Sequence, residues 1–433
     1  MSQDVKPEAL TETDEYRYRA ILVAIRGSET DEITSEESLD ELERLLHTDD
    51  SIACGRVIQN LDTAHPTHYV GKGKAEDVRL LVEQTGANCV IFDDEISARQ
   101  QSTLDEFFGE NVTVLDRTAL ILEIFAQHAT TKEGKLQVEL ATLEYQLPRL
   151  RGMWSHLEKE KLGGGVGARF GMGESQLETD RRLARKRIGE IKKLLNLVKK
   201  DRLTQRQNRL NSATFRVSLV GYTNAGKSSL LNALTGADVL AYNKLFATLD
   251  STTRRLELPD KRIVTLTDTV GFIHKLPHQL VAAFRSTLDE VQDAQLLLHV
   301  VDASSPQRAM MMTAVREVLQ EIGAEHIASI IVFNKVDLLS EQERETLTNK
   351  YPGAVLVSAV EQLGFDALLQ RIVTASNIDS EQLNVLLPYK EGHLLKMAHE
   401  QTSILNKEFT EEGISLTLLV PASLAGYFSP YRR

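Results

Sequence analysis

The segment from Gly221 to Ser228 constrains this chain most, because it reads Gly-Tyr-Thr-Asn-Ala-Gly-Lys-Ser between an apolar run at 215–220 and a helical pattern at 229–234. This order predicts a strand, a glycine-rich loop and a helix. The backbone N–H groups of such a loop, together with the positive end of the helix, bind a di- or triphosphate. A chance glycine turn would not be framed by both elements. The predicted nucleotide-binding residues here are Gly221, Tyr222, Thr223, Asn224, Ala225, Gly226, Lys227 and Ser228.

Length and composition predict several globular domains. The chain has 433 residues, which exceeds a single hydrophobic core, and 42% of them are hydrophobic. The net charge of -12 argues against a protein that coats nucleic acid along its whole surface. Cys54 and Cys89 are the only cysteines and have no metal-like spacing, so a disulfide framework and a zinc site are not supported.

The N-terminus and the hydropathy pattern bear on location. The chain starts with a polar segment and contains no run of eighteen apolar residues, so we expect a cytoplasmic protein without a membrane span. No heptad seam favours a dimer, and we therefore expect a monomer.

Residues 1–115 alternate short β-type runs with helical patterns. Parallel strands need a crossover, usually a helix, so this alternation predicts a small parallel α/β sheet covered on both faces. The expected strands lie at 20–25, 53–58, 88–93 and 112–115, and the expected helices at 35–47, 73–85 and 97–108. The turn from Gly71 to Lys74 opens the second helix. Its glycines and lysines can be interpreted as an anion site, but a plain left-handed turn is the interpretation we favour.

Residues 116–212 are predicted to form a long helical hairpin with a glycine-rich loop at 163–173. The loop carries Arg169 and Phe170 among six glycines, which favours a functional loop over a flexible linker. The second helix, at 175–209, holds twelve basic and four acidic residues, and such a helix in an acidic protein favours a polyanion, RNA, over a solvated face of mixed charge. Its expected buried stripe is Leu183, Ile188, Ile191, Leu194, Leu195 and Val198.

Residues 213–375 carry further motifs in the order of a GTPase, which predicts a doubly wound P-loop domain with strands at 215–220, 263–268, 296–301, 329–334 and 354–358. Asp268 can hold Mg²⁺ through a water, and the Gly271 N–H can donate to the γ-phosphate. Asp337 can accept two hydrogen bonds from guanine, which makes ATP the weaker substrate. The further nucleotide-binding residues are Asp268, Thr269, Val270, Gly271, Asn334, Lys335, Val336, Asp337, Ser358, Ala359 and Val360.

The segment 245–254 occupies the place of the first switch, where a threonine completes Mg²⁺ coordination when the γ-phosphate is present. Thr248, Thr252 and Thr253 compete for this role, and their spacing does not choose among them. Residues 376–433 are predicted to form a small α+β domain, with a helix at 390–407 and a strand at 413–421.

The chain resembles the HflX family of translation-associated GTPases over nearly its whole length. The resemblance rests on the loop 221–228, the segment Phe246, Ala247, Thr248, Leu249 and Asp250, the run Asp268 to Phe272, the glycine-rich loop up to Glu174 and the N-terminal run Val70 to Lys74. It implies that Ser228 and Thr248 are the Mg²⁺ ligands and that the segment 246–250 binds nucleotide. It also implies binding to the large ribosomal subunit and its rRNA, splitting of stalled or idle ribosomes under stress, and some ATP hydrolysis besides GTP hydrolysis.

We predict that Lys227, Thr248 and Gly271 take part in catalysis. Two further residues, Phe272 and Asn224, set expectations for how hydrolysis proceeds. Many small GTPases place a glutamine after the last glycine of the third motif to orient the attacking water, whereas this chain has Phe272, which predicts slow intrinsic hydrolysis and stimulation by a partner. The Asn224 side chain is placed to hold a K⁺ ion against the phosphates, or only to brace the loop.

The sequence therefore predicts a GTP-hydrolysing switch that acts on the large ribosomal subunit. The alternatives are a GTPase of ribosome assembly or RNA modification and a nucleotide-regulated protein scaffold. The scaffold would leave the basic helix unexplained.

Overall fold

The computed structural model describes residues 16–27, 34–150, 172–210, 214–236, 246, 251–275, 290–377 and 380–433. The chain divides into two compact units, one of Met1–Ile124 with Tyr145–Leu183 and the other of Phe125–Glu144 with Ala184–Arg433. Parallel sheets, a helical region and a C-terminal antiparallel sheet are all present, so the predicted fold class is confirmed. The predicted domain boundaries after residues 115, 212 and 375 stay predictions.

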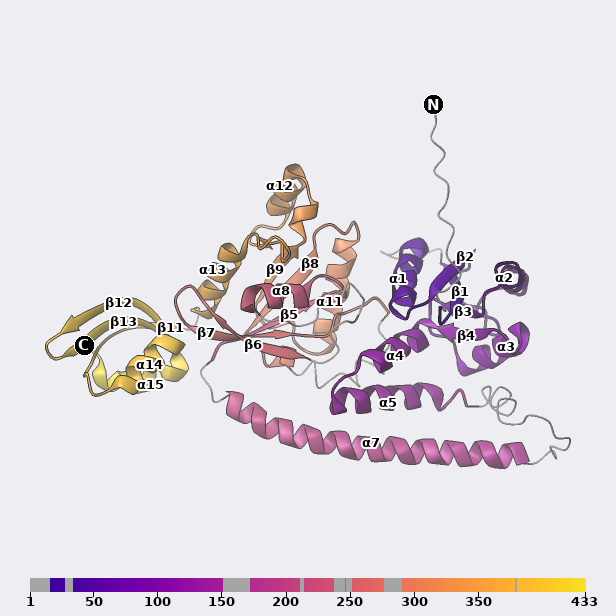
Figure 1. Ribbon diagram of the computed structural model, residues 1–433, viewed down its shortest axis with the longest axis horizontal. Helices are drawn as coiled ribbons and strands as arrows, with labels where there is room; N and C mark the ends of the chain where they lie inside the picture. The colour runs from indigo at the N-terminus through magenta and orange to yellow at the C-terminus, as the bar shows by residue number, and fades with distance from the viewer. Residues whose placement is uncertain are drawn as a thin grey trace. The chain divides into compact units, whose positions relative to one another are not determined.

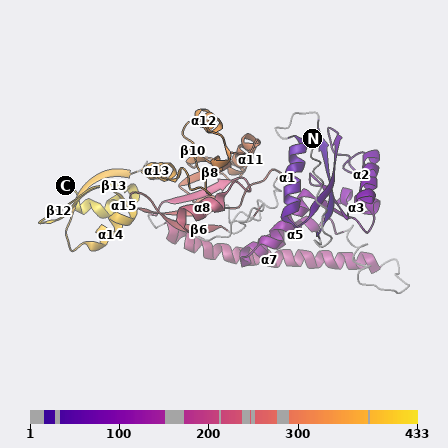
Figure 2. The ribbon, with the colours of Figure 1, turned by 45° about the horizontal axis from the view of Figure 1, so that its top comes forward.

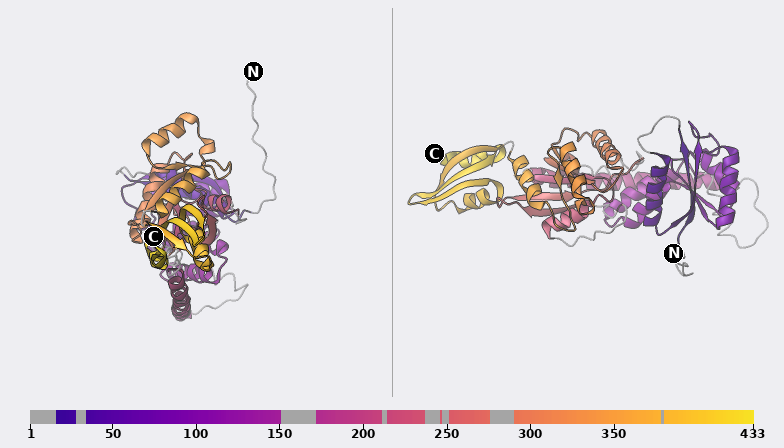
Figure 3. Two further views of the ribbon diagram at one scale, coloured as in Figure 1. Left: turned by 90° about the vertical axis from the view of Figure 1, so that its left-hand side faces the viewer. Right: turned by 90° about the horizontal axis from the view of Figure 1, so that it is seen from above.

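The N-terminal sheet has the strand order β2-β1-β3-β4 and is parallel throughout. Helix α1 covers one face, while α2 and α3 cover the other (Figures 2 and 3). Thr34 and Ser97 begin α1 and α3 with capping boxes, which satisfy N–H groups that the helices leave unpaired. The elements are β1 (Arg19–Arg26), α1 (Ser35–Thr48), β2 (Ile52–Asn60), α2 (Lys72–Thr85), β3 (Cys89–Phe92), α3 (Ala98–Phe108) and β4 (Thr113–Asp116).

The expected left-handed turn at Gly71 is wrong. Gly71 has an extended backbone (φ -62°) and is the N-cap of α2, whereas the left-handed residue is Tyr69, with φ +65°. The Gly71 N–H donates to Gln59 Oε1 at 2.8 Å, and a Cβ at position 71 would lie 3.1 Å from Gln59 Nε2. A side chain at position 71 would make a tight contact with the Gln59 side chain, so glycine here suits packing and not backbone handedness.

Three helices follow, α4 (Arg117–His128), α5 (Lys132–Gln146) and α7 (Met172–Leu210). Arg187 of α7 makes two hydrogen bonds to Glu139 of α5, at 2.6 and 2.8 Å, and Lys192 pairs with Glu144 at 2.8 Å. These pairs mean that part of the positive charge of α7 holds the hairpin together. Residues 151–171, which include most of the predicted glycine-rich loop, lie outside the described part.

The expected buried stripe of α7 is confirmed only in part. Ile191 is buried, and Ile188, Leu195 and Val198 are half-buried, but Leu183 is 55% exposed and Leu194 is 38% exposed. A helix that packs along one neighbouring helix buries only a narrow row of side chains, and leucines one position off that row stay in solvent.

The six-stranded sheet has the order β10-β9-β8-β5-β7-β6, parallel except for β6, which runs antiparallel to β7. Sequence patterns missed β6, which is the edge strand next to β7, overlaps the end of the predicted switch and exposes most of its residues. The strands are β5 (Arg216–Gly221), β6 (Thr252–Glu257), β7 (Ile263–Asp268), β8 (Leu296–Asp302), β9 (Ser329–Asn334) and β10 (Val355–Leu356). The helical elements are α8 (Lys227–Thr235), α11 (Arg308–Glu321), η1 (Val336–Leu338), α12 (Glu341–Lys350) and α13 (Phe365–Ser376).

The C-terminal sheet is antiparallel, in the order β11-β13-β12, and is packed against α14 and α15 (Figure 1). The predicted helix over 390–407 is wrong beyond residue 401, because residues 403–410 form a strand whose partners in β13 lie farther along the chain. The elements are β11 (Ser380–Leu387), α14 (Gly392–Gln401), β12 (Ser403–Thr410), β13 (Gly413–Pro421), α15 (Ala422–Phe428) and η2 (Ser429–Tyr431). Within the described ranges, no helix has both the length and the apolar character needed to cross a bilayer.

Candidate functional site

The predicted motifs meet at the carboxyl edge of the six-stranded sheet. The glycine-rich loop follows β5, Asp268 ends β7, Asn334 ends β9 and Ser358 follows β10. The chain leaves β5 toward β7 on one side and then returns to β8 on the other side, so the strand order reverses next to β5. Ligands of open α/β sheets bind at such a reversal, outside the carboxyl ends of the strands.

Close packing requires the two glycines of the loop. Gly226 has φ +88°, and a Cβ there would lie 2.2 Å from Asn334 Nδ2. At Gly221 a Cβ would lie 2.2 Å from the carbonyl oxygen of Val300. Any side chain at either position would push the loop away from β8 or β9, and the curved backbone that can surround a phosphate would be lost.

Lys227 is buried at the start of α8, with 6% of its surface exposed. Its Nζ donates to the carbonyl oxygens of Gly221 at 3.1 Å and Tyr222 at 2.9 Å. Burial lowers the pKa of Lys227 to about 8, and the nearby Asp268 carboxylate opposes this shift. The amine is thus held inside the curve of the loop, where a phosphate would meet it.

Oxygen atoms suited to a hard cation lie beside this lysine. The Ser228 hydroxyl donates to Asp268 Oδ2 at 2.6 Å, and Asp268 is fully buried. Next to it, Thr269 Oγ1 donates to the Leu219 carbonyl at 2.6 Å, which holds the motif against β5. A hydroxyl and a carboxylate that converge in this way fit Mg²⁺, which prefers oxygen ligands.

The base-binding motif is braced from both sides. Asn334 Nδ2 donates to the Ala225 carbonyl at 3.0 Å, and Asn334 Oδ1 accepts from the Ala359 N–H at 3.0 Å. One side chain therefore ties the phosphate loop to the loop after β10. Lys335, with φ +63°, pairs through Nζ with Asp302 Oδ2 at 2.6 Å. Its aliphatic stem is held in place as a result.

Asp337 is the residue predicted to recognise guanine. Its Oδ1 atom is buried and has no hydrogen-bond partner among the residues that the structure describes. A buried carboxylate oxygen without a donor is costly, so this atom suits a ligand N–H. In the neighbouring loop Ser358 and Ala359 are buried and Val360 is 79% exposed, which leaves that loop open on its outer side.

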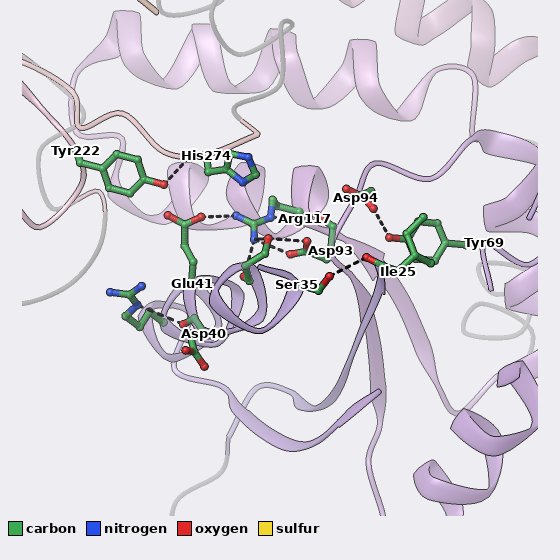
Figure 4. A network of polar contacts seen from close by, with 12 residues as sticks. Ile25, Ser35, Asp40, Glu41, Tyr69, Asp93, Asp94, Arg117, Tyr222 and His274 are labelled. Atoms are coloured by element: carbon green, nitrogen blue, oxygen red, sulfur yellow. Dashed lines mark hydrogen bonds and ion pairs between the residues drawn. The ribbon is translucent and has the colours of Figure 1, made fainter. Parts of the chain in front are cut away.

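The phosphate loop is bonded directly to the segment after Asp268. The Thr223 N–H donates to the Phe272 carbonyl at 2.8 Å, and the Phe272 N–H donates to the Gly221 carbonyl at 3.1 Å. The Tyr222 hydroxyl accepts from the His274 N–H at 2.6 Å (Figure 4). The Phe272 side chain is 1% exposed, so it is packed in the interior.

The first-switch residues are only partly described. Phe246 is buried and lies edge-on to Phe125, with ring centroids 4.5 Å apart. Residues 247–250, with the predicted Mg²⁺ ligand Thr248, lie outside the described ranges. The other two candidates for the switch threonine, Thr252 and Thr253, both belong to β6. Thr253 Oγ1 lies 2.9 Å from Thr267 Oγ1. The hydroxyl of Thr253 is therefore engaged within the sheet.

Sequence reasoning missed two features of this site. Asp302 was not predicted, although its position at the end of β8, beside the other motifs, is the signal that could have indicated it. The bond from Tyr222 to His274 could not be predicted, because Tyr222 stands at a position of the loop pattern that any residue can occupy.

Three family models match the chain. They are described as GTP-binding GTPase N-terminal over residues 36–126, GTP-binding GTPase Middle Region over 128–209 and 50S ribosome-binding GTPase over 216–335. Among solved structures, a GTP-binding protein from the archaeon Sulfolobus solfataricus in complex with GDP is 22% identical, with a TM-score of 0.42 over 83% of this chain and 98% of that chain.

Curated relatives are considerably more similar. GTPase HflX of Caldanaerobacter subterraneus is 46% identical over 398 residues, 92% of this chain and 90% of that protein. GTPase HflX of Escherichia coli is 43% identical over 404 residues, 93% of each chain. On this evidence the chain belongs to the HflX family of GTP-hydrolysing enzymes.

Proposed function

We propose that the chain acts in the cytoplasm as a GTP-driven switch that binds the large ribosomal subunit and splits or rescues stalled and idle ribosomes. The observation that carries this proposal is the basic surface of α7. Arg182, Arg185, Lys186 and Lys193 are exposed along it, although the whole protein has a net charge of -12. A positive surface on an acidic protein favours a polyanion such as rRNA.

For the nucleotide, we infer that GTP binds at the carboxyl edge of the six-stranded sheet. The loop 221–228 would surround the phosphates, and Lys227 would contact the β- and γ-phosphates. The Gly271 N–H would bond the γ-phosphate, and the Asp337 carboxylate would accept from guanine. The Oδ1 atom of Asp337, buried and without a partner in the described part of the chain, supports the last assignment. Slow ATP hydrolysis is expected at this same edge, because adenine still leaves the phosphate contacts intact.

Two cations belong to the proposal. Ser228 and Thr248 would ligate Mg²⁺, with Asp268 acting through a water, and the ion would neutralise charge on the phosphates. Asn224, exposed and with φ +59°, would hold K⁺ beside the phosphates. Turnover in K⁺ and Na⁺ buffers tests this second role, since equal rates in the two buffers would reduce Asn224 to a brace of the loop.

Partner stimulation follows from the third motif. The buried Phe272 cannot form a hydrogen bond to water, so the free protein should hydrolyse GTP slowly. We expect large ribosomal subunits to raise steady-state GTP turnover by more than about tenfold. The description of the model matched by residues 216–335, 50S ribosome-binding GTPase, supports the choice of partner.

Co-sedimentation with purified large subunits tests the function. We expect the chain to pellet with a non-hydrolysable GTP analogue, to be released with GDP, and to lose affinity steeply as salt rises, because phosphate contacts release counterions. Charge reversal at Arg182, Arg185 and Lys186 should prevent pelleting. The same reversal at Lys261 and Lys350, which lie on the six-stranded domain, is the matched control. Absence from the pellet in both nucleotide states at low salt contradicts the proposal.

A role in ribosome assembly or RNA modification is the second candidate, and the same basic surface supports it. The two roles differ in their effect on intact ribosomes. Splitting predicts that the GTP-bound chain converts intact ribosomes to subunits on a sucrose gradient, whereas an assembly factor leaves them intact. A nucleotide-regulated protein scaffold would bind neither intact ribosomes nor their subunits.

A further inference from the structure

We propose that Thr223 is a catalytic residue of the GTPase reaction, and that its hydroxyl orients the water that attacks the γ-phosphate. The inference rests on the proposed nucleotide site. It answers the question that Phe272 raises, namely which group replaces the missing glutamine.

None of the residues that the structure describes bonds to the Thr223 hydroxyl. Thr223 is 6% exposed, and its Oγ1 atom is buried without a hydrogen-bond partner among the described residues. The neighbouring polar side chains differ, because Lys227, Ser228 and Thr269 each have a partner within 3.1 Å. A buried hydroxyl without a partner costs stability and calls for an explanation, and a ligand that bonds it supplies one.

The position of Thr223 is that of a group beside the γ-phosphate. A Cβ built on Gly271 would lie 2.8 Å from Thr223 Cα, 2.9 Å from Thr223 Cγ2 and 3.0 Å from Lys227 Nζ. Thr223 thus packs against the face of Gly271 and next to the lysine. These are the two residues whose N–H and amine are expected to contact the γ-phosphate.

The segment around Phe272 holds Thr223 in this position. The Thr223 N–H and the Phe272 carbonyl are bonded, and the Tyr222 hydroxyl anchors the N–H of His274 (Figure 4). Gly271 has no side chain, and the buried side chain of Phe272 cannot form a hydrogen bond. Of the residues 223, 271 and 272, Thr223 is therefore the one whose side chain can. A hydroxyl can accept a hydrogen bond from water and donate one to a phosphate oxygen.

In this reaction the Thr223 hydroxyl needs only to orient the attacking water. The water oxygen forms a bond to the γ-phosphorus while the bond from that phosphorus to the β–γ bridging oxygen breaks, and GDP leaves. The proton of the water ends on the released phosphate, because a threonine hydroxyl is too weak a base to retain it.

Thr223→Val tests the proposal, since valine keeps the shape of threonine without its hydroxyl. Single-turnover hydrolysis by the full chain should fall about tenfold to a hundredfold, the usual effect of losing one hydrogen bond to a reacting group. Affinities for fluorescent GTP and GDP should stay within about threefold, and the melting temperature should not fall, because none of the described residues bonds this hydroxyl in the free protein. Thr223→Ser should restore both the rate and the capture of aluminium fluoride with GDP, which mimics the transition state.

Thr402→Val is the matched control. Thr402 is buried, as Thr223 is, but its hydroxyl donates to the Ala398 carbonyl at 2.7 Å, so this variant should lose stability and keep its rate. Unchanged hydrolysis by Thr223→Val overturns the proposal, as does a melting temperature that falls as in the control. If Lys227→Ala binds GTP as tightly as the natural chain does, the proposed nucleotide site itself fails, and that outcome is separate from either result at Thr223.

Discussion

The N-terminal sheet and the six-stranded sheet differ in the side-chain chemistry at the carboxyl ends of their parallel strands. In both sheets the strand order reverses, next to β1 in the N-terminal sheet and next to β5 in the six-stranded sheet. Either reversal is where an α/β sheet would hold a ligand. The chemistry of the side chains at each edge distinguishes a structural edge from a binding edge.

At the N-terminal edge the charged groups bond one another. Arg117 is 1% exposed, and it pairs with Glu41 at 2.8 Å and Asp93 at 2.6 Å (Figure 4). It also donates to the Ser38 carbonyl at 2.8 Å. Asp116 accepts from the N–H groups of Ile96 and Ala119, and burial raises its pKa to about 6. The reversal point is thus filled by the protein's own ions.

At the other edge two buried polar atoms have no partner among the described residues. Thr223 Oγ1 and Asp337 Oδ1 are buried and have no hydrogen-bond partner in the described ranges, one at the phosphate end and the other at the base end. The difference teaches that position in the fold is not enough to mark a ligand site. Buried atoms without a described partner also occur elsewhere, for example Arg149 Nε, so Thr223 Oγ1 and Asp337 Oδ1 support a ligand site because they coincide with the phosphate and base motifs.

The largest expected effect is at the structural edge. Arg117→Ala leaves Glu41 and Asp93 buried without their cation, and such a loss typically costs about 3–5 kcal/mol. Thermal and chemical unfolding of the N-terminal unit should show this loss, while GTP affinity stays unchanged.

Arg56→Ala is the control for that variant. Arg56 pairs with Asp40 and Glu43 at the surface, with a third of its side chain exposed, so the change should cost less than about 1 kcal/mol. If ATP at millimolar concentration restores the stability of Arg117→Ala, the N-terminal edge binds nucleotide and the contrast between the sheets is wrong.

A smaller effect is expected at the base end of the binding edge. Asp337→Ala removes the acceptor proposed for guanine, so GTP affinity should fall about a hundredfold while ATP affinity changes less than about threefold. Competition between the two nucleotides measures this selectivity. Asp366→Ala, an exposed carboxylate at the start of α13, should leave it unchanged. Equal loss of GTP and ATP affinity in Asp337→Ala would mean that the residue only supports the loop.

Local patterns predicted the parts of the molecule that depend on near neighbours. The loop 221–228, the parallel strands and the helix over 172–210 follow from spacing along the chain, and they were predicted within a few residues. Asp268, Asn334 and Ser358 meet at one edge because parallel strands place their carboxyl ends together.

The failures involve distant partners. Residues 403–410 form a strand because β13 pairs with them, and β6 exists because β7 offers it an edge. The left-handed residue in the loop before α2 is Tyr69 and not glycine, in a ring contact with Phe92 at 5.1 Å. Tertiary contacts decided each case, and no pattern within the segment carries that information.

The smallest expected effect comes from the amine of Lys227, whose pKa burial lowers to about 8. A bound triphosphate favours the charged amine, so above pH 8 binding must take up a proton, and GTP affinity should fall by up to about tenfold per pH unit. Below pH 7 it should be flat. Titrations between pH 6.5 and 9 measure this slope, and Lys227→Arg should remove it, because arginine stays charged.

The same amine predicts the opposite slope for the stability of the free protein. Because its pKa is about 8 when folded and 10.5 in the unfolded chain, the unfolded chain binds more protons between these values, and the contribution of Lys227 to stability rises with pH there. Affinity and stability should thus move in opposite directions above pH 8, relative to Lys227→Arg. At the N-terminal edge Asp116 has the opposite effect on stability at lower pH, since its raised pKa of about 6 makes its contribution to stability fall as pH rises from about 4 to 6. An affinity that stays constant to pH 9 would show that Lys227 keeps its charge in the free loop, and that the binding edge is less buried than its geometry indicates.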